Sequence, residues 1–302
     1  MRTLIKTGDN YGLCNRLFPF ANLIAASLEY GYRIRHAAFD EFTDYFEGTA
    51  GQAVPEFPRG NYCPWGGARG FRLRSKILRK LHLETSVSLG SSEIMDLGSP
   101  EFQKSLTRTT TQLNGLYYFD PVAFTKHQRE VREFFRLVEP LRSQVEHTVQ
   151  ICREKGDFLI GVHIRHGDYE TFANGMMFYS IEQYASLMQL TMDLFPGRNV
   201  TFLICSNVSV ALEPFRGLSV SLAPGHPAVD LYSLAECDAI IGSPSTFSEW
   251  ASFYGCVPRY QHRLKDYLRR SIPWQGVALQ DFKVHTSGFG RCAKEHFVSL
   301  RK

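Results

Sequence analysis

The sequence predicts an α/β protein of two domains, in which helices cover sheets of mostly parallel strands. Short apolar runs of strand length alternate with segments of helical period, a pattern typical of layered α/β proteins. The 302 residues are enough for two domains, and a hydrophobic content of 44% is enough for two cores. The alternation is most regular from residue 157 onward, so we place the domain boundary near residue 150.

In the first half of the chain, a strand over residues 4–6 is predicted to lead through a loop into a helix over residues 15–31. Apolar side chains recur at helical spacing in this helix: Leu17, Phe20, Ala21, Ile24 and Leu28. Pro19 is expected in its first turn and Gly31 at its end. Residues 32–37 are predicted to form the next strand.

Residues from about 40 to 115 carry weaker signals. The stretch 55–70 is rich in proline and glycine and is predicted to be a loop. Helices are expected at residues 99–106 and 129–141. The basic run over residues 69–80 is predicted to form an amphipathic helix, which is either only solvated or contacts a membrane surface or an acceptor.

The second half of the chain resembles a doubly wound nucleotide-binding domain. Ser180 is expected to cap the first helix of this half, and Gly255 is expected to end the last one. Strands are predicted over residues 157–165, 199–206 and 238–243, and helices over residues 180–195, 228–237 and 245–255.

The composition limits the kinds of partner and compartment. The chain has 34 basic and 30 acidic residues, and this balance is compatible with an anionic ligand but not typical of nucleic-acid-binding proteins. Seven scattered cysteines without a C-x-x-C pair predict reduced, buried thiols and no zinc site. No signal peptide and no apolar run of about 20 residues is visible, so a cytoplasmic protein without an integral membrane segment is expected.

The stretch FLIGVHIRHGDYE, residues 158–170, ends an apolar strand in a cluster of polar side chains. Alternate residues of a strand share a face, so His163 and Arg165 point to one side of the sheet and His166 to the other. Ligands of open α/β sheets bind where strands end, and the guanidinium of Arg165 is suited to phosphate while His163 is suited to a base or sugar. The alternative is that Arg165 and Asp168 form an ion pair that only fastens a loop.

A second loop, TGDNYGLCNRL at residues 7–17, connects a predicted strand to a helix. It contains Gly8 and Gly12, and helix N-termini of this kind bind anions through free N–H groups and the helix dipole. Asn15 and Arg16 add side-chain donors for such an anion. The loop lacks the G-K-[ST] ending of a P-loop, and a plain strand-to-helix turn is the alternative.

A third stretch, residues 229–255, contains a strand that runs through the sequence PSTF into a helix. Ser245 and Thr246 are good N-cap residues, and the same hydroxyls and helix N–H groups could also bind a phosphate. Asp230 offers a carboxylate that can accept hydrogen bonds from the N1–H and amino groups of guanine, which would select guanine over adenine.

Together, these three stretches resemble the fucosyltransferase superfamily. HIRHGDY resembles its H-x-R-R-G-D motif, with His166 in place of the second arginine; this H-x-R-H-G-D variant also resembles the rhizobial nodulation α1,6-fucosyltransferases. Residues 11–34 resemble the opening helix of the α1,2-fucosyltransferase group, and residues 230–255 resemble its stretch ending in S-[ST]-F-S-W-W, so the α1,2 group is the closest resemblance. The chain departs from the pattern of that group at Cys14, Pro19 and Glu249.

The resemblance implies a GT-B fold, in which two Rossmann-like domains face each other across a cleft. The expected parts are an acceptor-side domain over residues 1–150, a GDP-sugar-binding domain over residues 151–285 and a C-terminal tail over residues 286–302. It further implies transfer of L-fucose from GDP-fucose to a glycan hydroxyl with inversion, in an α1,2 linkage, without a metal or another cofactor.

The resemblance also implies roles for single residues. Arg165 is expected to bind the β-phosphate of the donor, His163 to lie near the guanosine and Asp230 to bind the guanine. The remaining donor-binding residues are expected to be Asn15, Arg16, Ser245, Thr246 and Phe247. Inversion suggests a general base, for which Asp168 and Glu170 are candidates because they directly follow the phosphate-binding strand; a role in salt bridges is the alternative.

Two other functions stay open: a GT-B transferase that uses another GDP-sugar, and a non-catalytic nucleotide-sugar-binding protein. The expected partners are a GDP-sugar and a glycan acceptor, and not a nucleic acid. Because the chain resembles bacterial members of the superfamily more than Golgi members, a cytoplasmic bacterial enzyme that modifies a polysaccharide or oligosaccharide precursor is expected.

Overall fold

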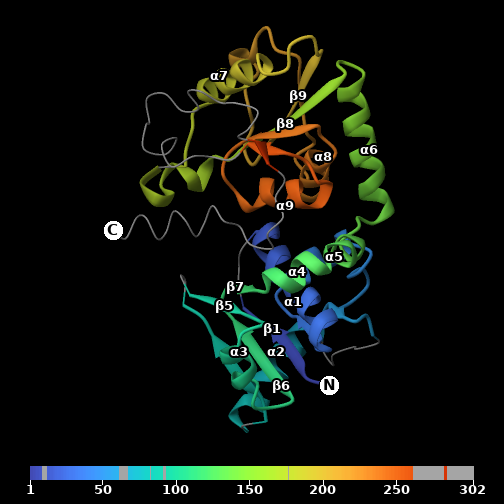
Figure 1. The fold of residues 1–302 in the computed structure, drawn as a ribbon, viewed down its shortest axis with the longest axis vertical. Coiled ribbons are helices and arrows are strands. Elements are labelled where there is room, and N and C mark those ends of the chain that lie inside the picture. The colour runs from blue at the N-terminus through green and yellow to red at the C-terminus, as the bar shows by residue number, and fades with distance from the viewer. Residues whose placement is uncertain are drawn as a thin grey trace. The chain divides into compact units, whose positions relative to one another are not determined.

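The chain forms two compact units, each built on its own mostly parallel sheet (Figure 1). The computed structural model describes residues 1–8, 12–60, 67–81, 83–90, 93–175, 177–260 and 282–283. The described part of unit 1 ends at Val138 and unit 2 begins at Glu139, so the division expected near residue 150 falls inside the first helix of unit 2. The tail predicted over residues 286–302 lies outside the described residues.

Unit 1 contains two sheets. Its strands are β1 (Thr3–Lys6), β2 (Arg33–His36), β3 (Glu56–Phe57), β4 (Thr85–Ser88), β5 (Ile94–Asp96), β6 (Thr110–Asn114) and β7 (Tyr117–Phe119). Its helices are α1 (Leu13–Tyr30), α2 (Gly67–Lys80), α3 (Pro100–Ser105), α4 (Pro121–Lys126), α5 (Gln128–Phe134) and the 3-10 helix η1 (Asp40–Tyr45). One sheet has the order β3-β2-β1-β6-β4, in which β3 is antiparallel to β2 and the other pairs are parallel, and β5 pairs with β7 in parallel.

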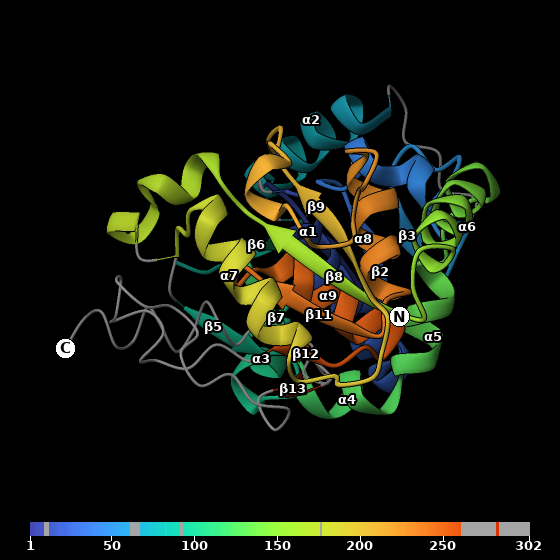
Figure 2. The same cartoon turned by 90° about the horizontal axis from the view of Figure 1, so that it is seen from above.

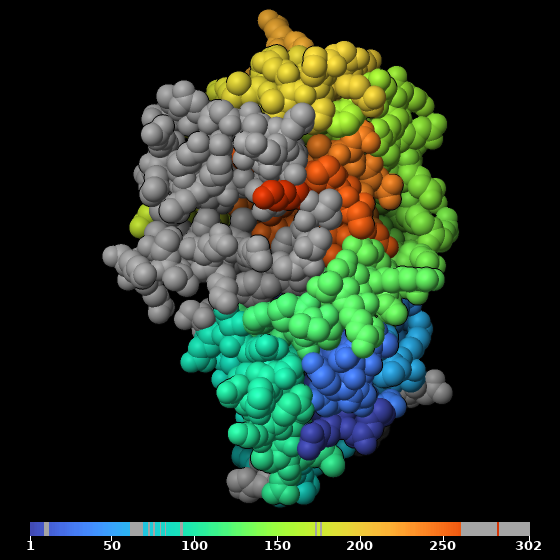
Figure 3. All heavy atoms as spheres, in the orientation of Figure 1, coloured from blue at the N-terminus to red at the C-terminus, as the bar shows by residue number. Residues whose placement is uncertain are grey.

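Helix α1 follows β1 and is buried along most of its length. It ends as predicted at Gly31, whose φ of 71° is left-handed and whose N–H donates to the carbonyl of Ser27 at 2.9 Å. Its start was predicted two residues late, because Gly12 is the N-cap; Pro19 therefore lies in the second turn and not in the first. Helix α1 packs against α4, and Figure 3 shows α4 and α5 in green beside α1 in blue at the surface of unit 1.

The prediction of one helix over residues 129–141 is wrong. Helix α5 ends at Phe134, and α6 (Glu139–Arg153) begins five residues later. Pro140 lies in the first turn of α6, where its missing N–H is tolerated, whereas inside a helix it would remove a hydrogen bond. The backbone between the two helices pairs with an earlier loop instead, since the N–H of Glu47 donates to the carbonyl of Arg136 at 2.8 Å.

Unit 2 contains a sheet with the order β10-β9-β8-β11-β12-β13. Its strands are β8 (Phe158–Ile164), β9 (Val200–Ser206), β10 (Val220–Leu222), β11 (Ala239–Gly242), β12 (Arg259–Tyr260) and β13 (Phe282–Lys283). Its helices are α6, α7 (Ile181–Met192), α8 (Pro227–Ala235), α9 (Thr246–Gly255) and the 3-10 helices η2 (Gly167–Glu170), η3 (Phe172–Gly175) and η4 (Glu213–Phe215). The pair β12–β13 is antiparallel and the other pairs are parallel.

The two faces of β8 follow the predicted alternation. Three of its apolar residues share a core with α7, which lies across the sheet in Figure 2: Ile160, Val162 and Ile164. Gly161 faces the other side, where a Cβ atom would lie 2.5 Å from the side chain of Leu234 in α8. A small residue is therefore needed here for α8 to pack on the strand, and His163 lies on this same face.

The ends of two helices of unit 2 test the predicted caps. Ser180 caps α7 as predicted, in a capping box with Gln183. Gly255 was predicted to end α9 as its cap but is its last helical residue, and Cys256 adopts the left-handed conformation instead, with a φ of 55°. A Cβ atom at Gly255 would collide with the carbonyl of Ala235, so this glycine allows α9 to pack closely on α8.

The cysteines of the described residues are free thiols. Four are buried as predicted, namely Cys14, Cys152, Cys205 and Cys237, whereas Cys256 is exposed at the end of α9. Cys63 and Cys292 lie outside the described residues. Within the described ranges, no helix combines the length and the apolar character that crossing a membrane requires.

Candidate active site

The order of the strands in unit 2 reverses between β8 and β11. From β8 the chain adds β9 and then β10 on one side, and it returns to add β11 and then β12 on the other. In open α/β sheets, ligands bind at the carboxyl ends of the two strands that flank such a reversal. These ends are Ile164 and Gly242, and the predicted site residues follow each of them directly.

Arg165 directly follows β8 and is held in place by its backbone and its side chain. Its N–H donates at 3.0 Å to the hydroxyl of Ser243, which follows β11. Its guanidinium lies 2.8 Å from a carboxylate oxygen of Asp168 and 5.6 Å from the ring centre of Tyr169. The hydroxyl of Tyr169 donates at 3.1 Å to the carbonyl of Pro244. Because 35% of the Arg165 side chain stays exposed, this guanidinium is both oriented and open to an anion.

His163 is buried beside this arginine, and its ring stacks on that of Phe247 in the first turn of α9. The ring centres are 4.9 Å apart and the planes are inclined by 22°. Burial, with a smaller contribution from the charge of Arg165, lowers the pKa of His163 to about 3, so the imidazole is neutral near pH 7. Its Nδ1 atom has no hydrogen-bond partner among the described residues and could bind a polar group of a ligand.

The turn between β11 and α9 brings a helix N-terminus to the same edge of the sheet. Ser245 caps α9 as predicted, with its hydroxyl accepting at 3.2 Å from the N–H of Phe247. Thr246 is the first residue of the helix, and Ser248 ties the turn together by donating to the carbonyls of Ser243 and Ser245. The N–H groups of the first turn and the helix dipole favour an anion here.

Gly242 is required for the two strand ends to approach each other. Its φ of 120° lies in a region that other residues rarely adopt. A Cβ atom at this position would collide with the backbone of His163. The glycine thus sets the spacing between the end of β8 and the turn that leads into α9.

We expect Gly242→Ala to lower the free energy of unfolding by about 3 kcal/mol or more, since backbone strain and the collision with His163 add together. Thermal unfolding followed by circular dichroism measures this loss. Gly217→Ala is the matched control, because Gly217 also has a positive φ, of 90°, but a Cβ atom there meets nothing within 4 Å. Equal losses in the two variants would contradict the close approach as the cause.

Asp230 lies in the first turn of α8 and is 5% exposed. One carboxylate oxygen accepts from the N–H of Gly225 at 3.1 Å, and burial raises the pKa of Asp230 to about 6. The thiol of Cys205 contacts the carbonyl of Asp230 at 3.5 Å, and Cys205 is the register partner of His163. Asp230 therefore lies at the carboxyl end of β9, one strand away from His163.

Asp168 and Glu170 lie in the short helix η2, and both are exposed. Asp168 forms the ion pair with Arg165 that the alternative interpretation predicted. A role as a general base stays a prediction for both carboxylates.

Asn15 and Arg16 belong to unit 1, in the first turn of α1. Arg16 is buried, donates to the carbonyl of Ala38 and pairs with Glu41 at 2.9 Å. These contacts fasten α1 to the segment after β2, and a donor-binding role for Asn15 and Arg16 stays a prediction. The middle of the predicted loop, residues 9–11, lies outside the described residues.

Two buried polar pairs at this site were missed by the sequence-based prediction. Tyr184 of α7 hydrogen-bonds Ser243, the residue that holds the backbone of Arg165. Arg259 of β12 pairs with buried Glu249 of α9 at 3.3 Å, and the charge of Arg259 is a minor cause of the low pKa of His163. Tyr184 lies at a core position of its helix, and β12, which holds Arg259, is only two residues long, so neither residue could be recognised as part of a polar pair from the sequence. The departure from the α1,2 pattern at Glu249 was the only signal of these pairs in the sequence.

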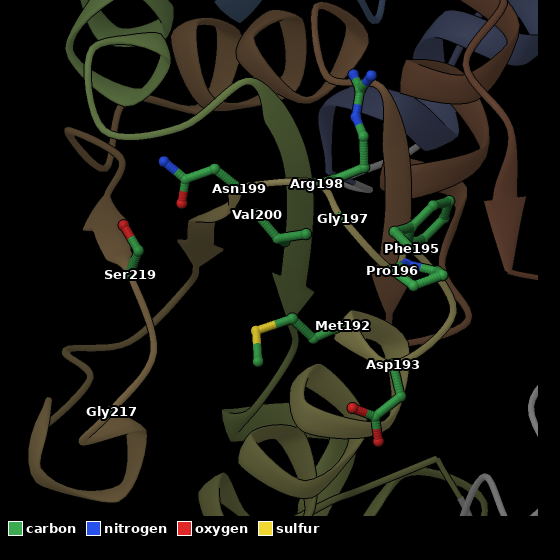
Figure 4. Close-up of a pocket in the computed structure, with 10 residues that line it drawn as sticks. All are labelled: Met192, Asp193, Phe195, Pro196, Gly197, Arg198, Asn199, Val200, Gly217 and Ser219. Carbon is green, nitrogen blue, oxygen red and sulfur yellow. The ribbon is translucent and has the colours of Figure 1, made fainter.

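A pocket of about 520 Å³ lies at the opposite edge of the sheet in unit 2 (Figure 4). Its lining residues come from the end of α7, the turn that enters β9 and the segment that enters β10, and include Asp193, Arg198 and Ser219. The amino ends of the strands meet at this edge, so the pocket is not part of the candidate active site. Within the described residues, no three histidine, cysteine or acidic side chains gather as metal ligands would.

Solved structures with a similar fold include fucosyltransferases. A mutant of FUT1 from Arabidopsis thaliana in complex with GDP is 14% identical, with 88% of this chain and 72% of that chain covered at a TM-score of 0.57. The α1,6-fucosyltransferase NodZ soaked with GDP-fucose is 16% identical, with 87% and 96% covered at a TM-score of 0.53. NodZ from Bradyrhizobium is also 16% identical, with 91% and 97% covered at a TM-score of 0.53. These likenesses confirm the predicted α/β class and GT-B fold.

The sequence itself matches a known protein family. The profile of one family, described as Glycosyl transferase family 11, matches residues 91–256, which is more than half of the chain. The matched stretch includes β8, β11 and α9, and therefore the residues at the strand reversal. Among curated proteins, none matches this sequence. The chain belongs to glycosyltransferase family 11 and is a glycosyltransferase enzyme with the fold of the fucosyltransferases.

Proposed function

We propose that this enzyme transfers L-fucose from GDP-fucose to a hydroxyl group of a glycan, with inversion and in an α1,2 linkage. The observation that carries the proposal is the oriented, half-exposed guanidinium of Arg165 at the strand reversal of unit 2. The similar NodZ crystal was soaked with GDP-fucose and the similar FUT1 mutant is in complex with GDP, which supports this donor. The α1,2 linkage rests on the resemblance of residues 11–34 and 230–255, and NodZ forms an α1,6 linkage.

The proposed roles follow from where charge develops in the reaction. The bond between the anomeric carbon and the β-phosphate oxygen breaks, and GDP leaves with its electron pair. The acceptor oxygen bonds to the anomeric carbon from the opposite face, and its hydroxyl proton passes to a general base, for which Asp168 and Glu170 are the candidates. Arg165 and the N-terminus of α9 would stabilise the charge that grows on the leaving diphosphate. His163 and Asp230 would bind the guanosine, with the carboxylate accepting from N1–H and the amino group of guanine.

No metal is part of the proposed reaction, because the guanidinium and helix N–H groups would take the role that a divalent cation has in other transferases. A cytoplasmic setting in a bacterium is also proposed. It is supported by the buried, free thiols of Cys152, Cys205 and Cys237, which fit a reducing compartment.

A screen of donor hydrolysis and transfer tests the proposal. The purified chain is incubated with GDP-fucose, GDP-mannose and UDP-sugars, each with and without EDTA, and the product linkage is determined by NMR. We expect turnover of GDP-fucose that EDTA does not change, and an α1,2 product with a suitable glycan. Preference for GDP-mannose, GDP binding without any turnover, or loss of activity in EDTA would each overturn a named part of the proposal.

We expect Asp168→Asn to lower kcat about 100-fold or more with little change in the KM for GDP-fucose. The amide still accepts a hydrogen bond from Arg165 but can no longer take the proton of the acceptor hydroxyl. Glu170→Gln is the matched comparison in the same short helix. If Asp168→Asn instead raises KM and leaves kcat unchanged, the carboxylate only positions the arginine.

A further inference from the structure

Helix α2 of unit 1 exposes an apolar stripe that the proposed chemistry does not use. Leu73 and Ile77 lie four residues apart on one side of the helix, and Leu81 continues this side directly after the last helical residue, since its N–H donates to the carbonyl of Ile77 at 3.1 Å. The three side chains are 62%, 51% and 60% exposed. Leu83, just beyond the helix, is 57% exposed. Four of the fourteen exposed large apolar side chains in the described part of the chain thus fall within eleven residues.

The stripe stands beside a dense positive charge. The stretch RGFRLRSKILRK, residues 69–80, contains six basic and no acidic residues. Among the side chains that the structure describes, Arg69, Arg74, Lys76 and Lys80 are exposed. With 100° per residue, Lys76 and Lys80 fall on the same outward half of the helix as Leu73 and Ile77.

The opposite side of α2 anchors the helix to unit 1. Phe71 is 1% exposed and packs in a cluster with Ile5 of β1, Ala37 and Val54. Figure 2 shows α2 running along the outer edge of unit 1. The apolar stripe is therefore not the face that buries the helix in its own core, which would be the usual reason for apolar residues at helical spacing.

We propose that α2 docks unit 1 onto the surface of an anionic lipid bilayer. A helix that lies in the membrane interface combines apolar residues, which enter the boundary between headgroups and acyl chains, with lysine and arginine residues at the level of the lipid phosphates. Leu73, Ile77 and Leu81 would make the apolar contact, and Lys76 and Lys80 would reach the phosphates through their long side chains.

The same observations disfavour other occupants of this face. A nucleic acid or a soluble acidic polysaccharide would use the charges but would leave the leucine and isoleucine side chains in water. Symmetric pairing of two copies through α2 would bring the positive charges of both helices together. An anionic bilayer would contact both the apolar stripe and the basic side chains of α2.

Vesicle sedimentation with the full chain tests the proposal. We expect binding to phosphatidylcholine vesicles that contain 30% phosphatidylglycerol, and at least tenfold weaker binding to phosphatidylcholine alone. Lys76→Gln with Lys80→Gln should weaken binding to the anionic vesicles about 25-fold, since each basic residue near such a surface contributes roughly fivefold. Leu73→Ser with Ile77→Ser should weaken it at least tenfold.

Matched controls change the same kinds of residue elsewhere. Lys104→Gln with Arg129→Gln removes two exposed charges, and Val122→Ser with Leu212→Ser removes two exposed apolar side chains. Both of these double variants should bind as the unchanged chain does. Equal binding to neutral and anionic vesicles would overturn the proposal. The proposal would also be overturned if the lysine variant lost binding while the variant Leu73→Ser with Ile77→Ser kept it, because that result would indicate a general polyanion site. Circular dichroism and vesicle-free donor turnover, which should not change in the α2 variants, separate this test from that of the proposed function.

Discussion

Arg165→Ala is expected to reduce transfer from GDP-fucose by about a thousandfold or more while the chain stays folded. In comparable phosphate chemistry, one arginine on the leaving or transferred phosphate accounts for a factor of this size. The side chain is 35% exposed and its described ion pair is with exposed Asp168, so its removal leaves no buried charge without a partner. Initial rates of transfer, with circular dichroism as the test of folding, measure the effect.

Two further variants separate catalysis from net charge. Arg198→Ala removes a half-exposed arginine at the opposite edge of the same sheet, where it lies 5.2 Å from the ring centre of Phe158, and should leave transfer unchanged. Arg165→Lys keeps the charge but loses the planar pair of donors, and should recover only a small part of the activity. Transfer by Arg165→Ala within tenfold of the unchanged chain would contradict the proposed mechanism.

Asp230→Asn is expected to stabilise the free enzyme and to weaken GDP binding at the same time. Burial raises the pKa of Asp230 to about 6 from an ordinary value of 3.8, which means that the folded chain holds the ionised carboxylate at a cost of about 1–3 kcal/mol above pH 6. An amide removes this cost and still accepts from the N–H of Gly225. The amide offers guanine one acceptor oxygen, whereas the carboxylate offers two, so the Kd for GDP should rise about 100-fold.

The sign of the pH dependence follows from the raised pKa of Asp230. The folded chain binds a proton more tightly than the unfolded chain, so this group favours folding at low pH, and that contribution is lost as the pH rises from about 4 through 6. The stability gain of Asp230→Asn should therefore be full at pH 7.5 and shrink toward pH 4. GDP binding should weaken below pH 6 in the unchanged chain, because protonation removes an acceptor.

Thermal unfolding at several pH values and calorimetric titration with GDP measure these two effects. Glu236→Gln is the control, because it removes an exposed carboxylate at the end of α8. It should change neither the stability of the chain nor its affinity for GDP. A variant Asp230→Asn that is less stable than the unchanged chain at pH 7.5 would show that burial does not strain this carboxylate. Unchanged GDP affinity would exclude it as the guanine ligand.

Local patterns in the sequence predicted much of unit 2. Apolar runs of strand length and helical periods located β8, β9, β11 and the three helices between and after them, because each pattern is set by residues close together in the chain. Ser180 and Ser245 were predicted as caps for the same reason. Predictions failed where distant residues decide: the helix expected over residues 129–141 is divided by pairing with a loop near Gly48, and Gly255 serves packing on α8 rather than ending α9.

The candidate site shows the same division. The sequence by itself determined that His163, Arg165 and Asp168 lie at the end of a buried strand and that Ser245 caps a helix, since strand alternation and capping are local properties. Only the tertiary structure decided that Gly242 brings these two segments together, that His163 stacks on Phe247, and that Asp230 lies one strand away. The physical reason is that such contacts depend on the order and register of strands, which arise from the packing of whole layers and leave no periodic signal in the chain.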